Sequence, residues 1–144
     1  DAFCVDRYRD EFLGLIRDGS LDILFANIHE LKSLYQTADA DTALAALRQE
    51  KNLLGVVTRS EEGALVVSGD ETKSVPASPV REVVDTTGAG DLFAAGFLAG
   101  LARGLDHADC ARLGAVAAAE IISHLGARPQ GDLKALAAQA GLKV

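Results

Sequence analysis

The sequence predicts an α/β fold in which helices flank a mostly parallel sheet. Two short apolar runs, residues 21–27 and 53–58, have helical patterns before and between them, an order typical of βαβ units with parallel strands. The chain has 144 residues, of which 49% are hydrophobic and 24% charged, so it can bury the core of one domain. We find no internal repeat and no low-complexity tract, and expect one globular domain of this class.

The first half of the chain is expected to alternate helices with buried strands. Tyr8, Phe12 and Leu15 recur at helical spacing with charged residues between them, which predicts an amphipathic helix. In chain order we expect a helix at residues 6–18, a strand at 21–27, a helix beginning within 27–30, a helix at 41–50 capped by Asp41, and a strand at 53–58.

The second half is expected to begin with a hairpin and to end in helices. The pair Gly69–Asp70 is a two-residue hairpin signal, and Pro76 and Pro79 mark an irregular link after it. Residues 88–103 are apolar nearly all round, which predicts a buried central helix. The expected elements are strands at 64–68, 72–75 and 80–84, and a helix at 88–103. Asp106 and Asp109 suit the start of a helix that runs to about Leu125, and Asp132 can cap a last helix at 132–139.

The composition argues against several classes of function. The formal net charge of −7 disfavours a nucleic-acid partner, because phosphate backbones are held mainly by clustered Lys and Arg. No apolar run approaches the roughly 18–20 residues of a membrane span, and residues 1–10 lack the layout of a signal peptide. Cys4 and Cys110 have no paired spacing, so neither a disulfide framework nor a zinc site is indicated. We therefore expect a cytoplasmic protein that binds small molecules, with no nucleic-acid or membrane partner.

A glycine-rich turn at residues 88–90 stands directly before the long apolar helix and predicts an anion site. Helix N-termini carry unpaired backbone N–H groups and about half a positive charge, so a phosphate is stabilised there without a lysine. Asp91 lies in the first turn of that helix. Two interpretations of Asp91 are open at this point: it complements the helix dipole, or it takes a proton from the group that attacks the phosphate.

Two common phosphate motifs do not fit this turn. A dinucleotide fingerprint needs G-x-G-x-x-G, but Phe93 stands where the third glycine belongs after Gly88 and Gly90. A P-loop needs Gly-Lys followed by Ser or Thr, and the chain has no Gly-Lys dipeptide. Both the dinucleotide-dependent oxidoreductase and the P-loop hypotheses are therefore disfavoured.

Residues 85–96, Asp-Thr-Thr-Gly-Ala-Gly-Asp-x-Phe-x-Ala-Gly, strongly resemble the C-terminal signature of the ribokinase-like, or PfkB, carbohydrate kinases. Three further features occur in the order typical of that family: Asn27-x-x-Glu30, Thr58 with Gly63, and Gly126-Ala127-Arg128-Pro129. The resemblance covers the whole chain, and the alanines at 117–119 look most like the adenosine-kinase branch. It implies a three-layer ribokinase-like fold.

The resemblance also implies that residues 1–144 form the C-terminal, nucleotide-binding half of a kinase domain. The N-terminal half of such a domain supplies most of the sugar pocket and the lid, and both would lie outside this chain. The chain contains no methionine although translation begins with one, which agrees with a fragment of about half a protein. We expect the isolated residues to show negligible turnover.

The activity that the resemblance implies is ATP-dependent phosphorylation of the primary hydroxyl of a sugar or nucleoside. Asp91 would be the base that accepts the hydroxyl proton during attack on the γ-phosphate of ATP. The backbone N–H groups of Gly88, Ala89 and Gly90 would form the anion hole. A different class of function stays open, namely a non-catalytic nucleotide- or phosphate-binding module that keeps the fold.

Two metal sites follow from the same resemblance. Asn27 and Glu30, one helical turn apart, would help to hold Mg²⁺, largely through water, and would orient phosphate. Asp85 and Thr87 match positions where several family members bind a monovalent cation such as K⁺. Structural roles are alternatives for both pairs: Asn27 as a turn residue with Glu30 as a first-turn charge, or Asp85 as an acceptor of backbone N–H bonds in its turn.

The nucleotide would contact two further regions in such a kinase. Thr58 would place a hydroxyl near the phosphates, followed by Ser60 and Gly63, and the family usually has glycine where this chain has Ser60. Residues that distinguish adenosine, ribose and fructose would lie in the other half, as would the lid through which family members often form homodimers. Adenine would lie near the long helix that begins at Asp106 and the turn after it, at Ala115, Ala119, Ser123 and Gly126.

Overall fold

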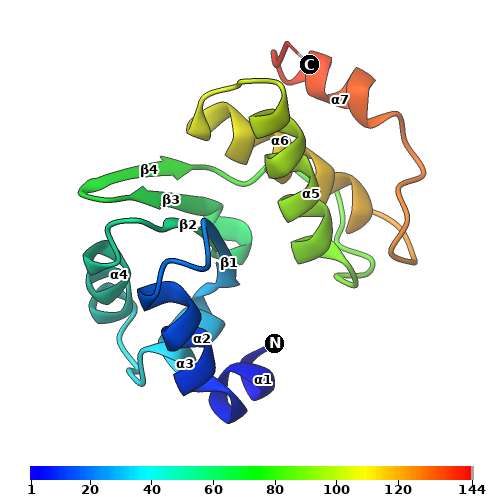
Figure 1. The fold of residues 1–144 in the computed structure, drawn as a ribbon. Helices are drawn as coiled ribbons and strands as arrows, with labels where there is room; N and C mark the ends of the chain where they lie inside the picture. Colours follow the sequence, from blue (N-terminus) through cyan, green and yellow to red (C-terminus); the bar gives the residue numbers. More distant parts are fainter. Residues whose placement is uncertain (144) are drawn as a thin grey trace. The chain divides into compact units, whose positions relative to one another are not determined.

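The computed structural model describes residues 1–143 (Figure 1). The chain divides into two compact units, the first comprising residues 1–59 and 65–73, and the second comprising residues 60–64 and the chain from Ser74 onward. The strands β1 (Ile23–Asn27), β2 (Leu54–Thr58), β3 (Ala64–Ser68) and β4 (Glu71–Val75) form one sheet in this order. The predicted combination of helices with a sheet is confirmed.

The N-terminal segment forms two short helices, α1 (Ala2–Arg7) and α2 (Arg9–Arg17), where the sequence predicts one helix at residues 6–18. Asp1 caps α1, since its carboxylate accepts a hydrogen bond from a backbone N–H two residues on, at 2.7 Å. Tyr8 interrupts the helix with φ −121° and ψ 32°. The predicted amphipathic helix is confirmed over residues 9–17, but its predicted start is wrong, because hydrophobic spacing reports which face is apolar and says little about a break of one residue.

β1 and β2 are a parallel pair, and the helices α3 (Ile28–Leu34) and α4 (Ala40–Gln49) connect them. Their register places Asn27, the last residue of β1, opposite Thr58, the last residue of β2. Both strands therefore end at the same edge of the sheet, as parallel strands do. The predicted βαβ order is confirmed.

The cap of α4 is Asp39 and not the expected Asp41. The Asp39 carboxylate accepts hydrogen bonds from the backbone N–H and the hydroxyl of Thr42, at 2.8 Å and 2.6 Å. Asp41 lies in the first turn, where its charge complements the helix dipole. Both aspartates suit a helix start, so the sequence pattern does not decide between them.

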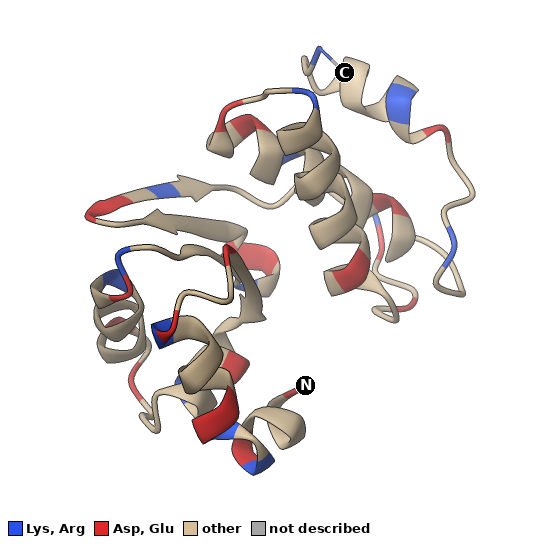
Figure 2. Cartoon of the chain, in the orientation of Figure 1, with Lys and Arg blue, Asp and Glu red and all other residues tan. Residues whose placement is uncertain are grey.

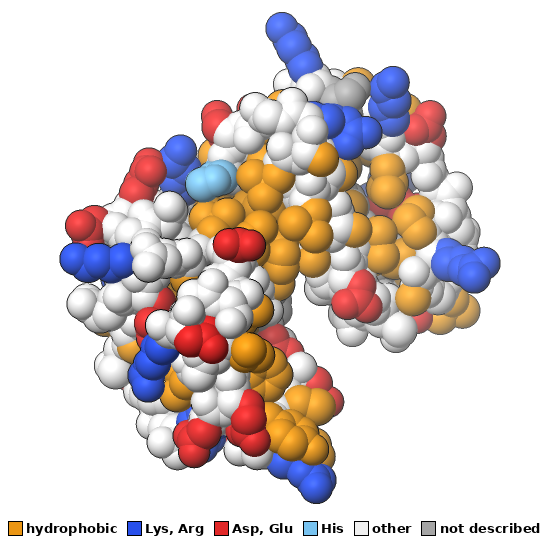
Figure 3. All heavy atoms as spheres, in the orientation of Figure 1, with side chains coloured by type: hydrophobic (Ala, Val, Ile, Leu, Met, Phe, Trp, Pro, Cys, Tyr) orange, Lys and Arg blue, Asp and Glu red, His pale blue; other side chains and the backbone are white. Residues whose placement is uncertain are grey.

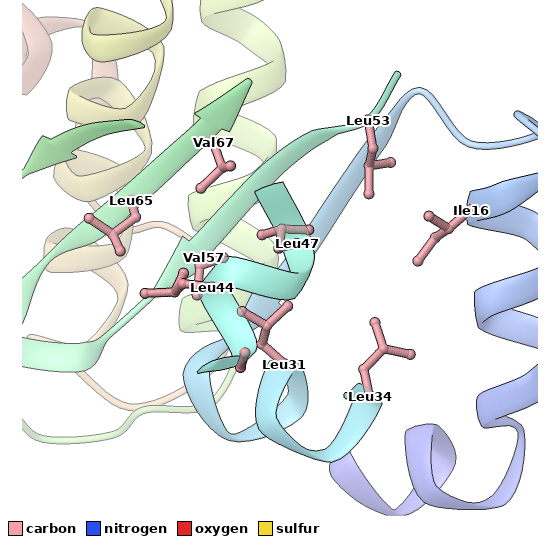
Figure 4. Close-up of a cluster of buried hydrophobic side chains, with 10 residues drawn as sticks. Ile16, Leu31, Leu34, Leu44, Leu47, Leu53, Val57, Leu65 and Val67 are labelled. Atoms are coloured by element: carbon pink, nitrogen blue, oxygen red, sulfur yellow. The ribbon is translucent and has the colours of Figure 1, made fainter. Parts of the chain in front are cut away.

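The core of the first unit joins the parallel strands to their helices (Figure 4). Leu31, Leu47 and Val57 are almost completely buried in it. Removing a side chain of this size from water stabilises the fold by about 1.5–3 kcal/mol. The buried members are Ile16, Leu31, Leu34, Ala43, Leu44, Leu47, Leu53, Val57, Leu65 and Val67. This packing holds the carboxyl ends of β1 and β2 in place.

β3 and β4 are neighbours joined by the two-residue turn Gly69–Asp70, and they therefore run antiparallel, as predicted. The strand predicted at 80–84 is wrong, because this segment has no strand partner within the described residues. Its Val84 N–H donates to the carbonyl of Ile122 at 2.8 Å, which is one bond and not a ladder. An apolar run becomes a strand only where a neighbouring backbone pairs along its length.

Three helices form most of the second unit: α5 (Ala89–Ala102), α6 (His107–Ile121) and α7 (Leu133–Gln139). Asp106 caps α6 and Asp132 caps α7, as the sequence predicts. α6 ends about four residues before the expected Leu125, and an irregular turn follows it. None of the described helices combines the length and the apolar character that a bilayer crossing requires.

α5 and α6 approach each other closely through two glycines. A Cβ at Gly96 would lie 2.8 Å from the Cα of Gly114, and a Cβ at Gly114 would lie 2.7 Å from the carbonyl oxygen of Phe93. Both positions therefore depend on glycine. α5 buries Phe93 and Phe97, whereas Leu98 is 46% exposed, and hydrophobic side chains show on the surface over this helix (Figure 3). The helix expected to be buried all round is thus buried on one face in the described chain.

Candidate functional site

The carboxyl ends of β1 and β2 bring three of the predicted residues together. Asn27 lies opposite Thr58, and Glu30 follows in the first turn of α3. Asn27 Oδ1 accepts hydrogen bonds from the N–H groups of His29 and Glu30, at 3.0 Å and 2.9 Å. Glu30 Oε2 accepts the N–H of Asn27 at 2.8 Å, which completes a capping box. The helix-start interpretation of Asn27 and Glu30 is confirmed.

Capping limits what this pair offers to a metal ion. Both acceptor lone pairs of Asn27 Oδ1 are in use, which leaves its side-chain NH₂ group to donate to an anion. Glu30 Oε2 is also in use, because it accepts the N–H of Asn27. Because carboxylate oxygens carry further lone pairs, Glu30 suits a magnesium ion that keeps its waters. No group of three or more His, Cys, Asp or Glu side chains in the described residues could hold a metal ion.

The segment after Thr58 is a tight turn with two left-handed residues. Residues 60–62 form one 3₁₀ turn, and the N–H of Gly63 donates to the carbonyl of Ser60 at 3.1 Å. Ser60 has φ 53° and Gly63 has φ 84°. A Cβ at Gly63 would lie 2.1 Å from the carbonyl oxygen of Val75, so only glycine fits there. Ser60 holds a conformation that glycine adopts more easily.

The start of α5 has the geometry of an anion site. Gly88 is the N-cap with φ 81°, and Asp91 is exposed in the first turn. Within the described residues, the N–H groups of Gly88, Gly90 and Asp91 have no protein acceptor. The N–H of Ala89, by contrast, donates to the carbonyl of Thr86 at 3.2 Å and closes the turn. Three free amides and a free carboxylate therefore share this helix end.

Residues 85–91 contain no lysine or arginine, and the charged side chains elsewhere are interspersed in sign (Figure 2). An anion at this helix end would therefore be held by backbone N–H groups and by the helix dipole. Gly88 has φ 81°, a left-handed conformation that glycine adopts readily. The geometry suits a phosphate group.

Asp85 ties this turn to the turn that follows α6. Its Oδ1 accepts the N–H of Thr87 at 2.9 Å, and its Oδ2 accepts the N–H of Gly126 at 3.1 Å. Hydrogen bonds from Thr87, and then from Gly126, hold the pKa of the Asp85 carboxyl below its ordinary value. A Cβ at Gly88 would lie 3.0 Å from the Cβ of Ala127, so the two turns also touch. The turn-stabilising interpretation of Asp85 is confirmed.

Glu120, near the end of α6, holds the other end of the same turn, and the sequence patterns did not single it out. Its Oε1 accepts the N–H groups of Gln130 and Gly131, at 2.8 Å and 2.6 Å. His124 Nε2 lies 3.1 Å from the same oxygen. Burial by itself raises the pKa of Glu120, but the two backbone N–H bonds and His124 outweigh it and lower that pKa. Only the i, i+4 spacing of Glu120 and His124 is visible in the sequence.

The residues predicted to lie near adenine differ in accessibility. Ala115 is buried at 7% exposure, Ala119 is half-buried, and Ser123 and Gly126 are exposed. The hydroxyl of Ser123 donates to the carbonyl of Glu120 at 2.6 Å. The end of α6 and the turn after it therefore offer more surface to a ligand than Ala115 does.

An open cavity of about 470 Å³ lies elsewhere in the second unit, among α5, α6 and α7. Its lining is mostly apolar and includes Leu92, Leu113 and Leu133. It contains none of the residues that the sequence singles out for the site. The residues that the sequence singles out for the site in this unit thus lie outside the cavity, most of them in turns and at helix ends.

Comparisons with known proteins agree with one another. The sequence profile of the pfkB family carbohydrate kinases matches residues 3–133. A cytidine kinase of Thermococcus kodakarensis is 36% identical over 126 residues, which cover 83% of this chain and 45% of that protein.

Solved structures share the predicted ribokinase-like fold. A probable sugar kinase from Rhizobium etli superposes with a TM-score of 0.95 at 51% identity, over 99% of this chain and 43% of that chain. An adenosine kinase from Sinorhizobium meliloti superposes with a TM-score of 0.92 at 51% identity, over 97% of this chain and 42% of that chain. The chain spans less than half the length of these relatives.

Proposed function

The chain belongs to the pfkB family of carbohydrate kinases, and on this premise we propose that it is the nucleotide-binding half of an ATP-dependent kinase that phosphorylates a primary hydroxyl of a sugar or nucleoside. The observation that carries the proposal is the start of α5, where an exposed Asp91 shares one helical turn with the free N–H groups of Gly88 and Gly90. These are the two components that phosphoryl transfer to an alcohol requires, a donor set for negative charge and a base.

The free amides would stabilise the charge that builds on the transferring phosphoryl oxygens. Donors that are already oriented cost no reorganisation during the reaction, and losing one costs roughly 3 kcal/mol of barrier. The N–H of Ala89 already closes the turn with Thr86, so Gly88 and Gly90 would supply most of the anion hole. The N–H of Asp91 is a further free donor that the sequence interpretation did not include.

Asp91 would act as the general base. In the proposed step the acceptor oxygen bonds to the γ-phosphorus, the bond to the bridging oxygen breaks, ADP leaves, and the hydroxyl proton passes to the Asp91 carboxylate. Asp91 is exposed in the first turn of α5, so its carboxylate is accessible to the hydroxyl of an acceptor. Its contribution would be a factor of about 10² to 10⁴ in rate.

The metal ions are part of the same proposal. Mg²⁺ would neutralise charge on the ATP phosphates, and Glu30 would hold it through water while the Asn27 NH₂ group donates to phosphate. Thr58 would add a hydroxyl near the phosphates. Asp85 and Thr87 would serve a monovalent cation such as K⁺, using carboxylate and carbonyl lone pairs that their turn leaves open.

The acceptor is proposed at the level of a sugar or nucleoside. The relatives described above are a cytidine kinase, a probable sugar kinase and an adenosine kinase, and their names span both classes. The alanine-rich end of α6 favours the adenosine-kinase branch. A cytoplasmic location, where ATP is abundant, and a homodimer formed through a lid outside these residues belong to the proposal as well.

One experiment tests the proposal directly. The full-length protein that contains this chain is assayed with Mg-ATP against a panel of nucleosides and sugars, with and without potassium. We expect transfer of phosphate to a primary hydroxyl of at least one acceptor, with adenosine and ribose as the first candidates. Tight binding of Mg-ATP without turnover on any acceptor would instead support the non-catalytic nucleotide-binding module.

A further inference from the structure

Glu120 is an almost fully buried carboxylate at the end of α6. Its side chain is 7% exposed, and that of His124, one helical turn later, is 17% exposed. A buried charge is costly unless hydrogen bonds compensate it, so its partners indicate its role. Those partners are the N–H groups of Gln130 and Gly131, ten and eleven residues away, and His124.

All three donors converge on one oxygen, Oε1, while Oε2 is buried and has no hydrogen-bond partner within the described residues. Bonds of backbone N–H groups to a carboxylate are charge-assisted, and the bond to Gly131 is short, at 2.6 Å. A carboxylate placed only to cap its own helix would not reach across to a later segment. The geometry therefore serves the turn between α6 and α7.

That turn, residues 126–131, is held at both ends. The N–H of Gly126 donates to Asp85 at its beginning, and Glu120 binds Gln130 and Gly131 at its end. All of its residues are exposed, so few buried contacts fix its conformation apart from these bonds. At its centre, Ala127 touches the place where a Cβ of Gly88 would lie, at 3.0 Å.

We infer that Glu120 is a positioning residue for the nucleotide: its carboxylate sets the conformation of turn 126–131, and this turn in its bonded conformation receives the base of ATP. The inference rests on the proposed function, which puts adenine at this turn, and it adds a residue that does not itself contact the nucleotide. Asp85 shapes the beginning of the turn next to the phosphate site, and Glu120 shapes the end.

Two variants at position 120 separate the effect of side-chain length from the effect of side-chain charge. Glu120→Asp keeps the negative charge but withdraws the carboxylate by one methylene, so it cannot bind both backbone N–H groups. Glu120→Gln keeps the length and one carbonyl oxygen that accepts both N–H groups, and it loses the charge. Glu82→Gln, at an exposed position of the same unit, is the matched control for the loss of one carboxylate.

The measurements are made on the full-length protein. Calorimetry gives the Kd for Mg-ATP, steady-state kinetics give kcat and both KM values, and amide hydrogen exchange reports on Gln130 and Gly131. For Glu120→Asp we expect the Kd and KM for ATP to rise about tenfold, and exchange at both amides to accelerate by at least the same factor. The kcat and the KM for the acceptor should change less than threefold. Glu120→Gln should stay within about threefold of the wild type in every quantity, and Glu82→Gln should match it.

Other results overturn the inference. Faster amide exchange with an unchanged Kd would mean that Glu120 only stabilises the turn, and an equal change in kcat and both KM values would mean a general loss of structure. If Glu120→Gln bound Mg-ATP more weakly than Glu120→Asp, the charge of the side chain and not its length would matter. If the wild type binds Mg-ATP but transfers no phosphate, the kinase proposal fails, and the Kd and exchange data still decide this inference; a wild type that binds no nucleotide overturns both.

Discussion

Asp85 accepts a hydrogen bond at 3.1 Å from the backbone N–H of Gly126, a residue 41 positions later in the chain. This bond joins the glycine turn at the start of α5 to the turn that follows α6. The other oxygen of the same carboxylate accepts the N–H of Thr87, so Asp85 organises both turns at once. One ionised side chain therefore joins the two turns, in addition to the close approach of Gly88 and Ala127.

Asp85→Asn should destabilise the protein in a pH-dependent manner. The pKa of Asp85 is lowered from its ordinary value of 3.8 in the folded chain, so its stabilising contribution is present above that pH and is lost as the pH falls through the lowered pKa. An asparagine presents an NH₂ group where one N–H donor must be accepted. Urea unfolding should show a difference between wild type and variant at pH 6 that shrinks below pH 4. A difference that stays constant down to pH 3 would show that the charge is unimportant.

Asp91→Asn should abolish most of the activity and little of the stability. Asp91 occupies the third helical position of α5 and is exposed, so the variant loses about 0.3–1 kcal/mol of dipole interaction. The rate of phosphate transfer should fall by about 10² to 10⁴. Asp109 occupies the same position in α6, and Asp109→Asn is the matched control. Asp109 also pairs with Arg112 at 2.9 Å, so this control should lose at least as much stability and keep full activity. Equal activity in both variants would eliminate Asp91 as the base.

Gly63→Ala should be strongly destabilising. The added Cβ would lie 2.1 Å from the carbonyl oxygen of Val75, at a residue with φ 84°. Overpacking together with the left-handed backbone should cost roughly 2–5 kcal/mol of unfolding free energy. Gly69 has φ 57° and open space around its Cβ position, so Gly69→Ala should cost only about 1–2 kcal/mol. Chemical denaturation of the two variants compares them, and equal losses would mean that the contact with Val75 relaxes freely.

Ser60→Gly should stabilise the protein slightly. Ser60 has φ 53°, and glycine removes the left-handed penalty of about 1–2 kcal/mol while it adds about 0.4–1 kcal/mol of unfolded-state entropy. We expect a net gain of about 0.5 kcal/mol in thermal or chemical unfolding. Ser68, exposed at the end of β3, has ordinary backbone geometry, so Ser68→Gly should lose about 0.5–1 kcal/mol. Losses in both variants would show that the Ser60 side chain makes a needed contact.

Tyr35 should ionise far above the usual range. Burial, and to a smaller extent the charge of Glu50, raises the pKa of Tyr35 to about 12, and Arg17 opposes the shift. The chain has two tyrosines and no tryptophan, so absorbance titration of a Tyr8→Phe variant isolates Tyr35. Because the folded pKa exceeds the unfolded value of about 10, the stability that Tyr35 contributes is lost as the pH rises from 10 to 12. Ionisation near pH 10 in the folded protein would contradict its burial.

Local sequence signals predicted helix starts and turns correctly where a single residue or a dipeptide is responsible for them. Asp106 and Asp132 were recognisable as helix caps, and Gly69–Asp70 as a hairpin turn, because each acts on backbone groups within three residues. The break at Tyr8 within the helix predicted at 6–18, and the absence of a strand at 80–84, could not be predicted for the opposite reason. A one-residue break and a missing strand partner leave no trace in hydrophobic spacing.

The candidate site shows the same division between features set by neighbouring residues and features set by distant ones. The places of Asn27 and Thr58 at strand ends and of Asp91 in the first turn of a helix could be predicted, because apolar runs and the glycine turn mark these ends in the sequence. Glu120 could not, because its partners lie ten and eleven residues away on a segment without regular structure. The free and bonded amides at residues 88–91 also became distinguishable only when the turn at Thr86 was known.

By itself, the sequence determined the family and predicted an anion site at the start of α5 with a carboxylate beside it, because the prediction follows from which residues adjoin a helix terminus. Only the tertiary structure decided which amides are free, that Asp85 holds Gly126, and that Glu120 holds the turn before α7. The physical reason is distance along the chain: patterns within a few residues encode local hydrogen bonds, whereas bonds between distant segments exist only after helix packing has brought the segments together.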